Sequence, residues 1–279
     1  MKSQVGIVRQ LFRYPVKSML GESLDELDVG ERGIVGDRAW ALREQNGRIV
    51  TAKKWANLLD FSASYDFAPK TGALAPVSIV LPGGRIIHAE DADASNVISA
   101  KLDRKVTLDR ARTDEHSRAE IDPETVFGDV GIENIKPEFT RETLPDSFAL
   151  SRGSFFDDST IHFLTTASLA RLHSLIGDDA RVDARRLRPN IVIETDPRMS
   201  GFVEDEWIAG SVLIGETATI VKMKPALRCV MTTHRQADLA RDLRILRAVA
   251  QNHSAELGIF ASVGAAGKVR VGDPVWLMI

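Results

Sequence analysis

Short apolar stretches interrupted by turn-forming residues constrain the fold of this chain more than any other feature. Residues 5–12 carry the apolar and polar mixture of a strand, and Pro15 ends that strand because proline lacks a backbone donor. Asn46-Gly47 separates two apolar stretches, at 40–42 and 49–50, and a tight hairpin turn needs the positive φ angles that these residues tolerate. Roughly the first sixty residues are therefore predicted to form a small antiparallel sheet or barrel.

The second half repeats the strand pattern and adds helices. Residues 191–193 are three consecutive β-branched residues, which is typical of a strand buried on both faces. A helical spacing of leucines predicts a helix that Thr166 caps and Gly177 ends, and a second helix is predicted from Asp238 to about residue 252. We expect a mainly β (α+β) protein in three parts: a small N-terminal β-barrel-like domain (1–112), an irregular linker (113–145) and a second β-rich domain with a few helices (146–279).

Length and charge exclude several classes of protein. A chain of 279 residues can form one large or two ordinary domains, and a net charge of −3 argues against a nucleic-acid partner. Residues 1–18 lack the continuous apolar segment of a secretory signal, and no apolar run approaches the length that spans a bilayer. We expect a cytoplasmic protein that binds no membrane and is a monomer or a weak oligomer.

Cys229 is the only cysteine of the chain and the first candidate for chemistry. A lone cysteine excludes internal disulfides and fits a reducing compartment. Arg228 precedes it, and two lysines lie a few residues before; neighbouring cations favour the thiolate, which is the form that attacks electrophiles and binds metals. The alternative is a small buried apolar residue, since cysteine is among the residue types most often buried.

Three stretches could bind an anion. Lys17-Ser18 follows the first strand, Thr165-Thr166 opens the predicted helix, and Arg188 belongs to an arginine-rich stretch at 185–188. Helix amides without partners and the planar fork of arginine both suit a phosphate. The alternatives are a solvated turn, ordinary helix capping and surface ion pairs, respectively.

No metal or nucleotide motif of the familiar kinds occurs. The six histidines show no metal-binding spacing, and the sequence contains no HExxH, CxxC, EF-hand, GxGxxG or Walker motif. A nucleophilic pair of Cys229 with His234 stays an alternative, because five residues along a chain do not define a catalytic geometry.

Seven motifs in order resemble the MOSC family, and more closely its amidoxime-reducing branch, in which an N-terminal β-barrel domain precedes a MOSC domain. They span nearly the full chain, which makes the match specific. The motifs are YPVKS (14–18), GDRAW (36–40), FLTTASL (163–169), RLRPNIVI (186–193), EDxW (204–207), RCVMTT (228–233) and VGDPV (271–275).

The resemblance implies a C-terminal MOSC β-barrel and a molybdenum–molybdopterin cofactor, with Cys229 as the protein ligand to molybdenum. A soft thiolate suits such a metal. The resemblance also implies that donors from both halves bind the phosphate of the pterin, so that the cofactor lies between the domains. Its cofactor-binding candidates are Lys17, Ser18, Arg38, Asp157, Ser159, Thr165, Thr166, Arg188, Asn190 and Arg228.

The function implied is an enzyme that reduces N-hydroxylated or N-oxygenated small molecules. No cysteine-rich redox domain follows the second half, so we expect a separate electron donor of the ferredoxin, flavodoxin or cytochrome type. Two departures from the family pattern, Leu227 and the loop 234–238, predict an altered active-site mouth. The alternatives are a carrier or sulfur-transfer protein for the cofactor, with a persulfide on Cys229, and a homologue that binds no cofactor.

Overall fold

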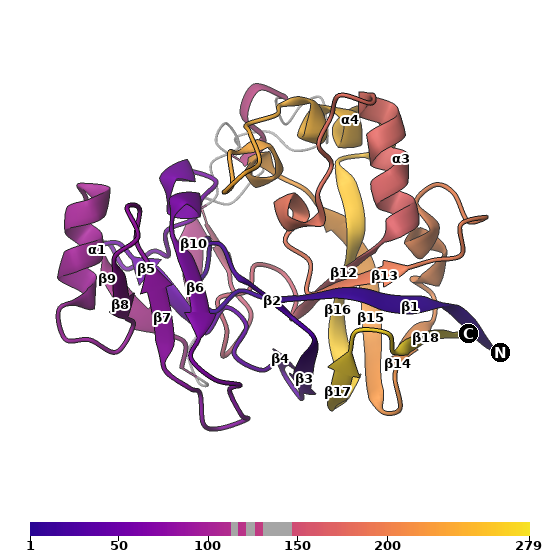
Figure 1. Ribbon diagram of the computed structural model, residues 1–279, viewed down its shortest axis with the longest axis horizontal. Helices are drawn as coiled ribbons and strands as arrows, with labels where there is room; N and C mark the ends of the chain where they lie inside the picture. Colours follow the sequence, from indigo (N-terminus) through magenta and orange to yellow (C-terminus); the bar gives the residue numbers. More distant parts are fainter. Residues whose placement is uncertain (113–116, 121–125, 131–146) are drawn as a thin grey trace.

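The computed structural model describes residues 1–112, 117–120, 126–130 and 147–279, and its regular structure is mostly strand (Figure 1). The described part holds three α-helices: α1 (Ala94–Leu102), α3 (Thr166–Ile176) and α4 (Arg244–His253). The predicted mainly β class is confirmed. None of these helices has the length and apolar composition needed to cross a membrane.

Seven strands close into a barrel, in the order β13, β12, β16, β15, β14, β18 and β1, with β1 returning to β13. A closed barrel with an odd number of strands cannot alternate direction throughout, so one neighbouring pair must be parallel. That pair is β12 and β13, which α3 connects. The bounds are β1 (Lys2–Arg13), β12 (Ile161–Thr165), β13 (Ile191–Glu194), β14 (Ser211–Ile214), β15 (Ala218–Leu227), β16 (Glu256–Ala265) and β18 (Pro274–Met278).

The first strand lies in the barrel of the second half, and the expectation that it belongs to an N-terminal sheet is wrong. Within β1, Ile7 is opposite Pro274 of β18 on one side and Glu194 of β13 on the other. The two chain ends consequently lie side by side (Figure 1). Three further strands extend these pairings: β2 (Glu22–Leu24) pairs with β1, β3 (Glu26–Gly30) pairs with β17 (Gly267–Arg270), and β4 (Gly33–Ile34) pairs with β3. The domain bounds 1–112 and 146–279 stay a prediction.

The N-terminal part has its own apolar core, formed by residues such as Trp40, Phe61, Ile79 and Ile98. The turn at Asn46-Gly47 forms, but it leads to a single bridge rather than to a paired strand. Helix α1 packs against this part, which also contains a 3-10 helix, η1 (Ala56–Asp60). The strands are β5 (Trp40–Arg43), β6 (Ser62–Tyr65), β7 (Val77–Val80), β8 (Ile86–His88) and β9 (Thr107–Arg110).

The predicted linker at 113–145 lies mostly outside the described residues, as do its apolar residues Ile132, Ile135 and Phe139. In its described pieces, β10 (Arg118–Glu120) pairs with β11 (Ser147–Ala149), and η2 (Gly128–Val130) follows a buried Phe127. Phe127 packs beside Ala250 and Ala255, so this piece of the segment docks on the second half.

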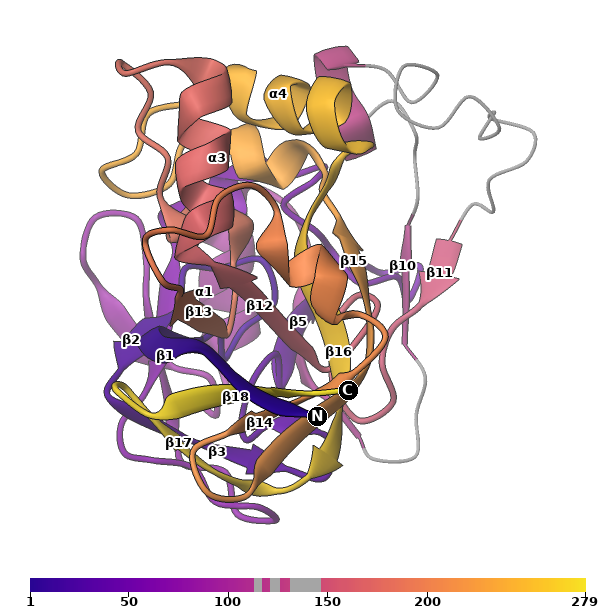
Figure 2. The same cartoon turned by 90° about the vertical axis from the view of Figure 1, so that its right-hand side faces the viewer.

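Helices α3 and α4 lie together over one end of the barrel (Figure 2). Two predicted helix starts are wrong. Thr165 rather than Thr166 caps α3, since the Thr165 hydroxyl accepts a hydrogen bond from the amide of Ser168. Helix α4 begins at Arg244, and Asp238 instead pairs with Arg181 and Arg185. Among the described residues, the other 3-10 helices are η4 (Ala184–Leu187), η5 (Val203–Trp207) and η6 (Val230–Thr233).

Candidate functional site

A cavity of about 210 Å³ is lined by residues of both halves. The N-terminal part contributes Lys17, Ser18, Arg38, Thr51 and Lys53. The other lining residues are Val126, Phe148, Phe156, Asp157, Asp158, His162, Arg186, Leu187, Arg188, Leu227, Arg228, Cys229, Met231 and Phe260. Seven of the eleven site residues predicted from the sequence therefore meet at one place, although they are as much as 212 positions apart along the chain (Lys17 to Cys229).

Positive charge is concentrated in this wall. Six cationic side chains face two carboxylates there, whereas the whole chain carries a net charge of −3. A low-dielectric cavity lined by one sign of charge attracts ligands of the opposite sign. The cations are Lys17, Arg38, Lys53, Arg186, Arg188 and Arg228. The charge of the cavity wall therefore favours an anionic ligand.

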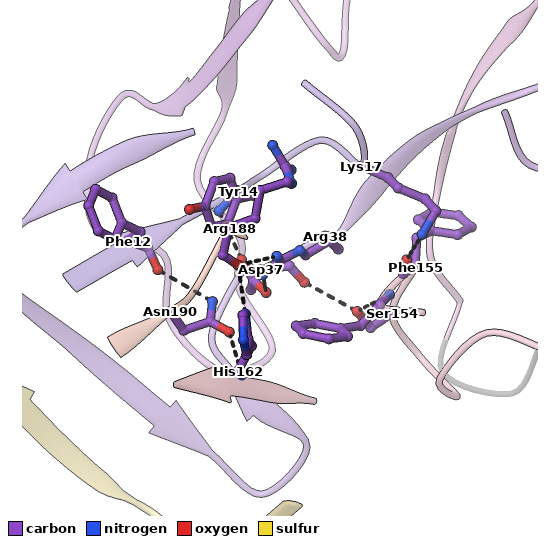
Figure 3. Close-up of polar contacts among 12 residues, drawn as sticks. Phe12, Tyr14, Lys17, Asp37, Arg38, Ser154, Phe155, His162, Arg188 and Asn190 are labelled. Carbon is purple, nitrogen blue, oxygen red and sulfur yellow. Dashed lines mark hydrogen bonds and ion pairs between the residues drawn. The ribbon is translucent and has the colours of Figure 1, made fainter. Parts of the chain in front are cut away.

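Arg38 and Arg188 bring the two halves together (Figure 3). A guanidinium nitrogen of Arg38 donates to the carbonyl of Arg188 at 3.2 Å, and another forms an ion pair with Asp37. Arg188 donates to the carbonyl of Met19 at 2.7 Å, and burial lowers the pKa of this guanidinium to about 10. Both arginines are buried, and Arg188 remains charged at neutral pH.

Asp157 neutralises two lysines in the same wall. Its carboxylate pairs with Lys17 and lies 3.0 Å from the Nζ of Lys53. Burial opposes the ionisation of Asp157, but the two ammonium groups outweigh it and hold its pKa below the usual range. Burial also lowers the pKa of Lys17, to about 8. For Lys53, burial acts in the same direction, but Asp157 and Cys229 outweigh it and raise the pKa.

Cys229 lines the cavity at the start of η6, directly after β15 and Arg228. Its exposure is intermediate, so the alternative of a buried apolar cysteine does not describe it. Arg228 donates to the carbonyl of Leu187 at 2.6 Å and contacts the Nε2 of His162 at 3.3 Å. Burial lowers the pKa of His162 well below its ordinary value, so the ring is neutral and can accept from Arg228.

Two buried guanidinium atoms of the wall have no hydrogen-bond partner in the described part of the chain: Nη2 of Arg188 and Nε of Arg228. Leaving a charged donor buried and unpaired is costly, so these atoms point to a ligand with acceptor oxygens. The described residues contain no cluster of three or more His, Cys, Asp or Glu side chains that could hold a metal.

Four predicted site residues lie elsewhere. Ser159 donates to the carbonyl of Ala261, and Thr165 both caps α3 and donates to Glu204 at 2.7 Å. Thr166 contacts the hydroxyl of Thr195 at 3.4 Å. Asn190 joins three strands: its side chain accepts from the amide of His162, its Nδ2 donates to Phe12, and its own amide donates to the carbonyl of His162 (Figure 3). None of these four residues lines the cavity.

Several lining residues were not predicted. Lys53 stands beside Asp157, His162 supports Arg228, and Phe156 lies 4.3 Å under the Arg38 guanidinium. None carries a local signature: Lys53 resembles any surface lysine, and His162 alternates with apolar residues in a buried strand. Only the tertiary fold brings them to the cavity.

Two family models match the first and the second half of the chain separately. The MOSC N-terminal beta barrel domain matches residues 5–113, and the MOSC domain matches residues 151–276. The chain is 28% identical over 298 residues to mitochondrial amidoxime reducing component 2 of Bos taurus, covering 99% of this chain and 84% of that protein. It is 25% identical over 297 residues to mitochondrial amidoxime-reducing component 1 of Homo sapiens, with 99% and 84% covered. A crystal structure of the YuaD protein from Bacillus subtilis aligns with a TM-score of 0.44 at 12% identity, covering 99% of this chain and 96% of that one.

Proposed function

The chain belongs to the MOSC family, with a MOSC N-terminal beta barrel domain before a MOSC domain, and on this premise we propose that it is a molybdenum-cofactor-dependent reductase. Its substrates are small molecules with an N-hydroxyl or N-oxide group. In the reaction the N–O bond breaks, two electrons and two protons are taken up, and water leaves. The relatives named for amidoxime reduction support this proposal along almost the whole chain.

One observation carries the proposal: a cationic cavity with unpaired buried donors holds the only cysteine of the chain in its wall. The residues fit the cofactor. Lys17, Ser18, Arg38 and Arg188 would bind its phosphate, with Arg188 offering the free Nη2, and Cys229 would ligate molybdenum. When bound, the cofactor supplies the two-electron chemistry that protein side chains lack.

The side chains of this protein have the remaining tasks of binding the substrate and limiting access of water. Seven apolar residues line the cavity together with Cys229: Val126, Phe148, Phe156, Leu187, Leu227, Met231 and Phe260. Such a wall suits the organic part of a substrate, while a few polar groups fix its orientation. Leu227, which departs from the family pattern, is 38% exposed and therefore belongs to the mouth of the cavity.

Electrons would come from a separate protein of the ferredoxin, flavodoxin or cytochrome type. One cysteine cannot hold an iron–sulfur cluster, which takes several cysteine ligands. We place the enzyme in the cytoplasm as a monomer or weak oligomer.

A second function is a carrier or sulfur-transfer protein for the same cofactor. The intermediate exposure of Cys229 favours it, because a persulfide on this sulfur could reach a partner. Molybdenum without turnover, or a sulfane sulfur on Cys229, would select this function over the reductase.

The decisive experiment measures molybdenum, pterin and amidoxime reduction with an artificial electron donor for the wild type and Cys229→Ser. We expect about one molybdenum per chain in the wild type. The serine variant should lose turnover and retain pterin, because the phosphate-binding side chains are unchanged. Ser159→Ala is the matched control, since this hydroxyl lies outside the cavity wall and binds the backbone of Ala261. Unchanged turnover in Cys229→Ser would exclude Cys229 as the metal ligand.

A further inference from the structure

The ring of Tyr14 lies against both arginines of the anion site. Its centroid is 4.1 Å from the guanidinium carbon of Arg188 and 4.4 Å from that of Arg38. Arg38 also lies over Phe156 at 4.3 Å (Figure 3 shows Tyr14 beside the two arginines). Tyr14 itself does not line the cavity, so it touches the ligand-binding side chains without reaching the ligand space.

We propose that Tyr14 is a positioning residue that holds Arg38 and Arg188 together as one clamp for a phosphate dianion. The two guanidinium groups come from different halves of the chain, and in the absence of a ligand they repel each other. The negative face of an aromatic ring attracts each of them and so opposes that repulsion. The clamp would bind any phosphate dianion, and only the assignment of the phosphate to a pterin rests on the proposed function.

The backbone fixes the ring in this position. The amide of Tyr14 donates to the Asp37 carboxylate at 2.8 Å, and the amide of Arg38 donates to the carbonyl of Tyr14 at 2.7 Å. Tyr14 belongs to a buried apolar cluster that also contains Leu187 and Val192. A ring held by backbone hydrogen bonds can align the two guanidinium groups that lie against it, which preorganises them for an anion.

The hydroxyl group of Tyr14 has no part in the clamp. It is buried, and it has no hydrogen-bond partner in the described part of the chain. Burial raises the pKa of Tyr14 to about 12, so the group stays neutral at physiological pH. The ring, and not the oxygen, is therefore the functional part, which separates this role from ordinary hydrogen-bond support.

The test compares Tyr14→Phe with Tyr14→Leu. Two readouts are used: pterin retained per chain after gel filtration, and the dissociation constant for inorganic phosphate, from thermal stabilisation at constant ionic strength. The leucine variant should bind phosphate about tenfold more weakly, because it loses two cation–π contacts, and the phenylalanine variant should restore binding to within about twofold. The other tyrosine, Tyr65, is the control: it is buried and contacts Arg13, but it lies outside the cavity wall, so Tyr65→Leu should lose stability and keep phosphate affinity.

Equal phosphate affinity of Tyr14→Leu and the wild type would overturn the proposal, as would equal losses in Tyr14→Phe and Tyr14→Leu. If Tyr14→Leu does not fold, Phe156→Leu takes its place: it removes one contact of Arg38 and should weaken phosphate binding severalfold, and no weakening would count against the clamp. Phosphate binding that depends on Tyr14 in a protein that never acquires pterin would disprove the proposed function and leave the clamp in place.

Discussion

Asp157 lies in the anion site and acts there as an internal counter-ion to two lysines. Removing its charge should lower the stability of the protein and raise its affinity for phosphate. In Asp157→Asn the side chain keeps its shape, but Lys17 and Lys53 lose their shared carboxylate. Two buried ammonium groups then lie near each other in the cavity wall without a shared carboxylate, with side chains only 7% and 11% exposed. A phosphate that enters the cavity would take over the role of the carboxylate.

The expected loss follows from burial. Removing one partner of a buried ion pair costs about 3–5 kcal/mol. The Asp157 side chain is 31% exposed, so screening by water reduces the figure, and we expect a loss of about 2–3 kcal/mol in the free energy of unfolding. For a chain of this size that corresponds to a fall in Tm of roughly 5–10 °C. Because the pKa of Asp157 is depressed, this stabilisation is present at pH 7 and is lost as the pH falls through the folded-state value.

Calorimetry of cofactor-free protein with and without phosphate, at constant ionic strength and pH 7, measures both effects. Phosphate should restore most of the lost Tm in Asp157→Asn and bind it about tenfold more tightly than the wild type, since one like charge has left the site. Asp158→Asn is the control for the loss of stability: Asp158 also lines the cavity, but its carboxylate is 56% exposed and pairs with Lys224, and such exposed pairs contribute about 0–1 kcal/mol. A Tm loss in Asp157→Asn that phosphate does not reverse would refute this reasoning.

Two further predictions concern pH and packing. With the pKa of Lys17 lowered to about 8 from 10.5, the unfolded chain binds more protons between these values, so stability from this group should rise with pH across that window, while phosphate affinity should fall above pH 8. Titration of phosphate affinity from pH 7 to 10 checks this, and in Lys17→Arg the fall should disappear. Gly258→Ala should cost about 2–4 kcal/mol in urea unfolding, because φ is +77° and the added Cβ would lie 2.7 Å from His162 Nε2 and 2.8 Å from the carbonyl of Phe163. Gly84→Ala, with φ of +89° and open space around it, should cost only about 1–2 kcal/mol, and equal losses would contradict the packing argument.

The sequence predicted the parts of the site that stand in short motifs. Lys17, Arg38, Arg188 and Cys229 each lie in a motif of the MOSC family, and all four line the cavity. Lys53 could not be found in this way, because its role comes from Asp157, a residue 104 positions away that only the fold places beside it. Motifs identify residues that act together, but the charges that balance them are set by the tertiary structure.

Strand existence was easier to predict than strand pairing. The pattern at residues 5–12 is that of a strand, yet nothing local indicates that β18, at the other end of the chain, is its partner. The same reason explains Thr165 and Thr166: two adjacent hydroxyls can each cap a helix, and the contact of Thr165 with Glu204 settles which one does. Long-range partners decided both outcomes.

Three of the eight non-glycine residues with positive φ in the described part of the chain line this cavity. Ser18, Arg38 and Arg188 all adopt left-handed conformations, with φ of 67°, 47° and 55°. Each such residue costs about 1–2 kcal/mol, which glycine would avoid. Arg188 is the clearest example, because it caps the C-terminal end of η4 in a left-handed conformation that glycine usually adopts. A glycine there would relieve the backbone but remove a guanidinium from the wall. The strained backbone at these three positions places their side chains in the cavity wall. Strained residues are expected at sites that bind a ligand.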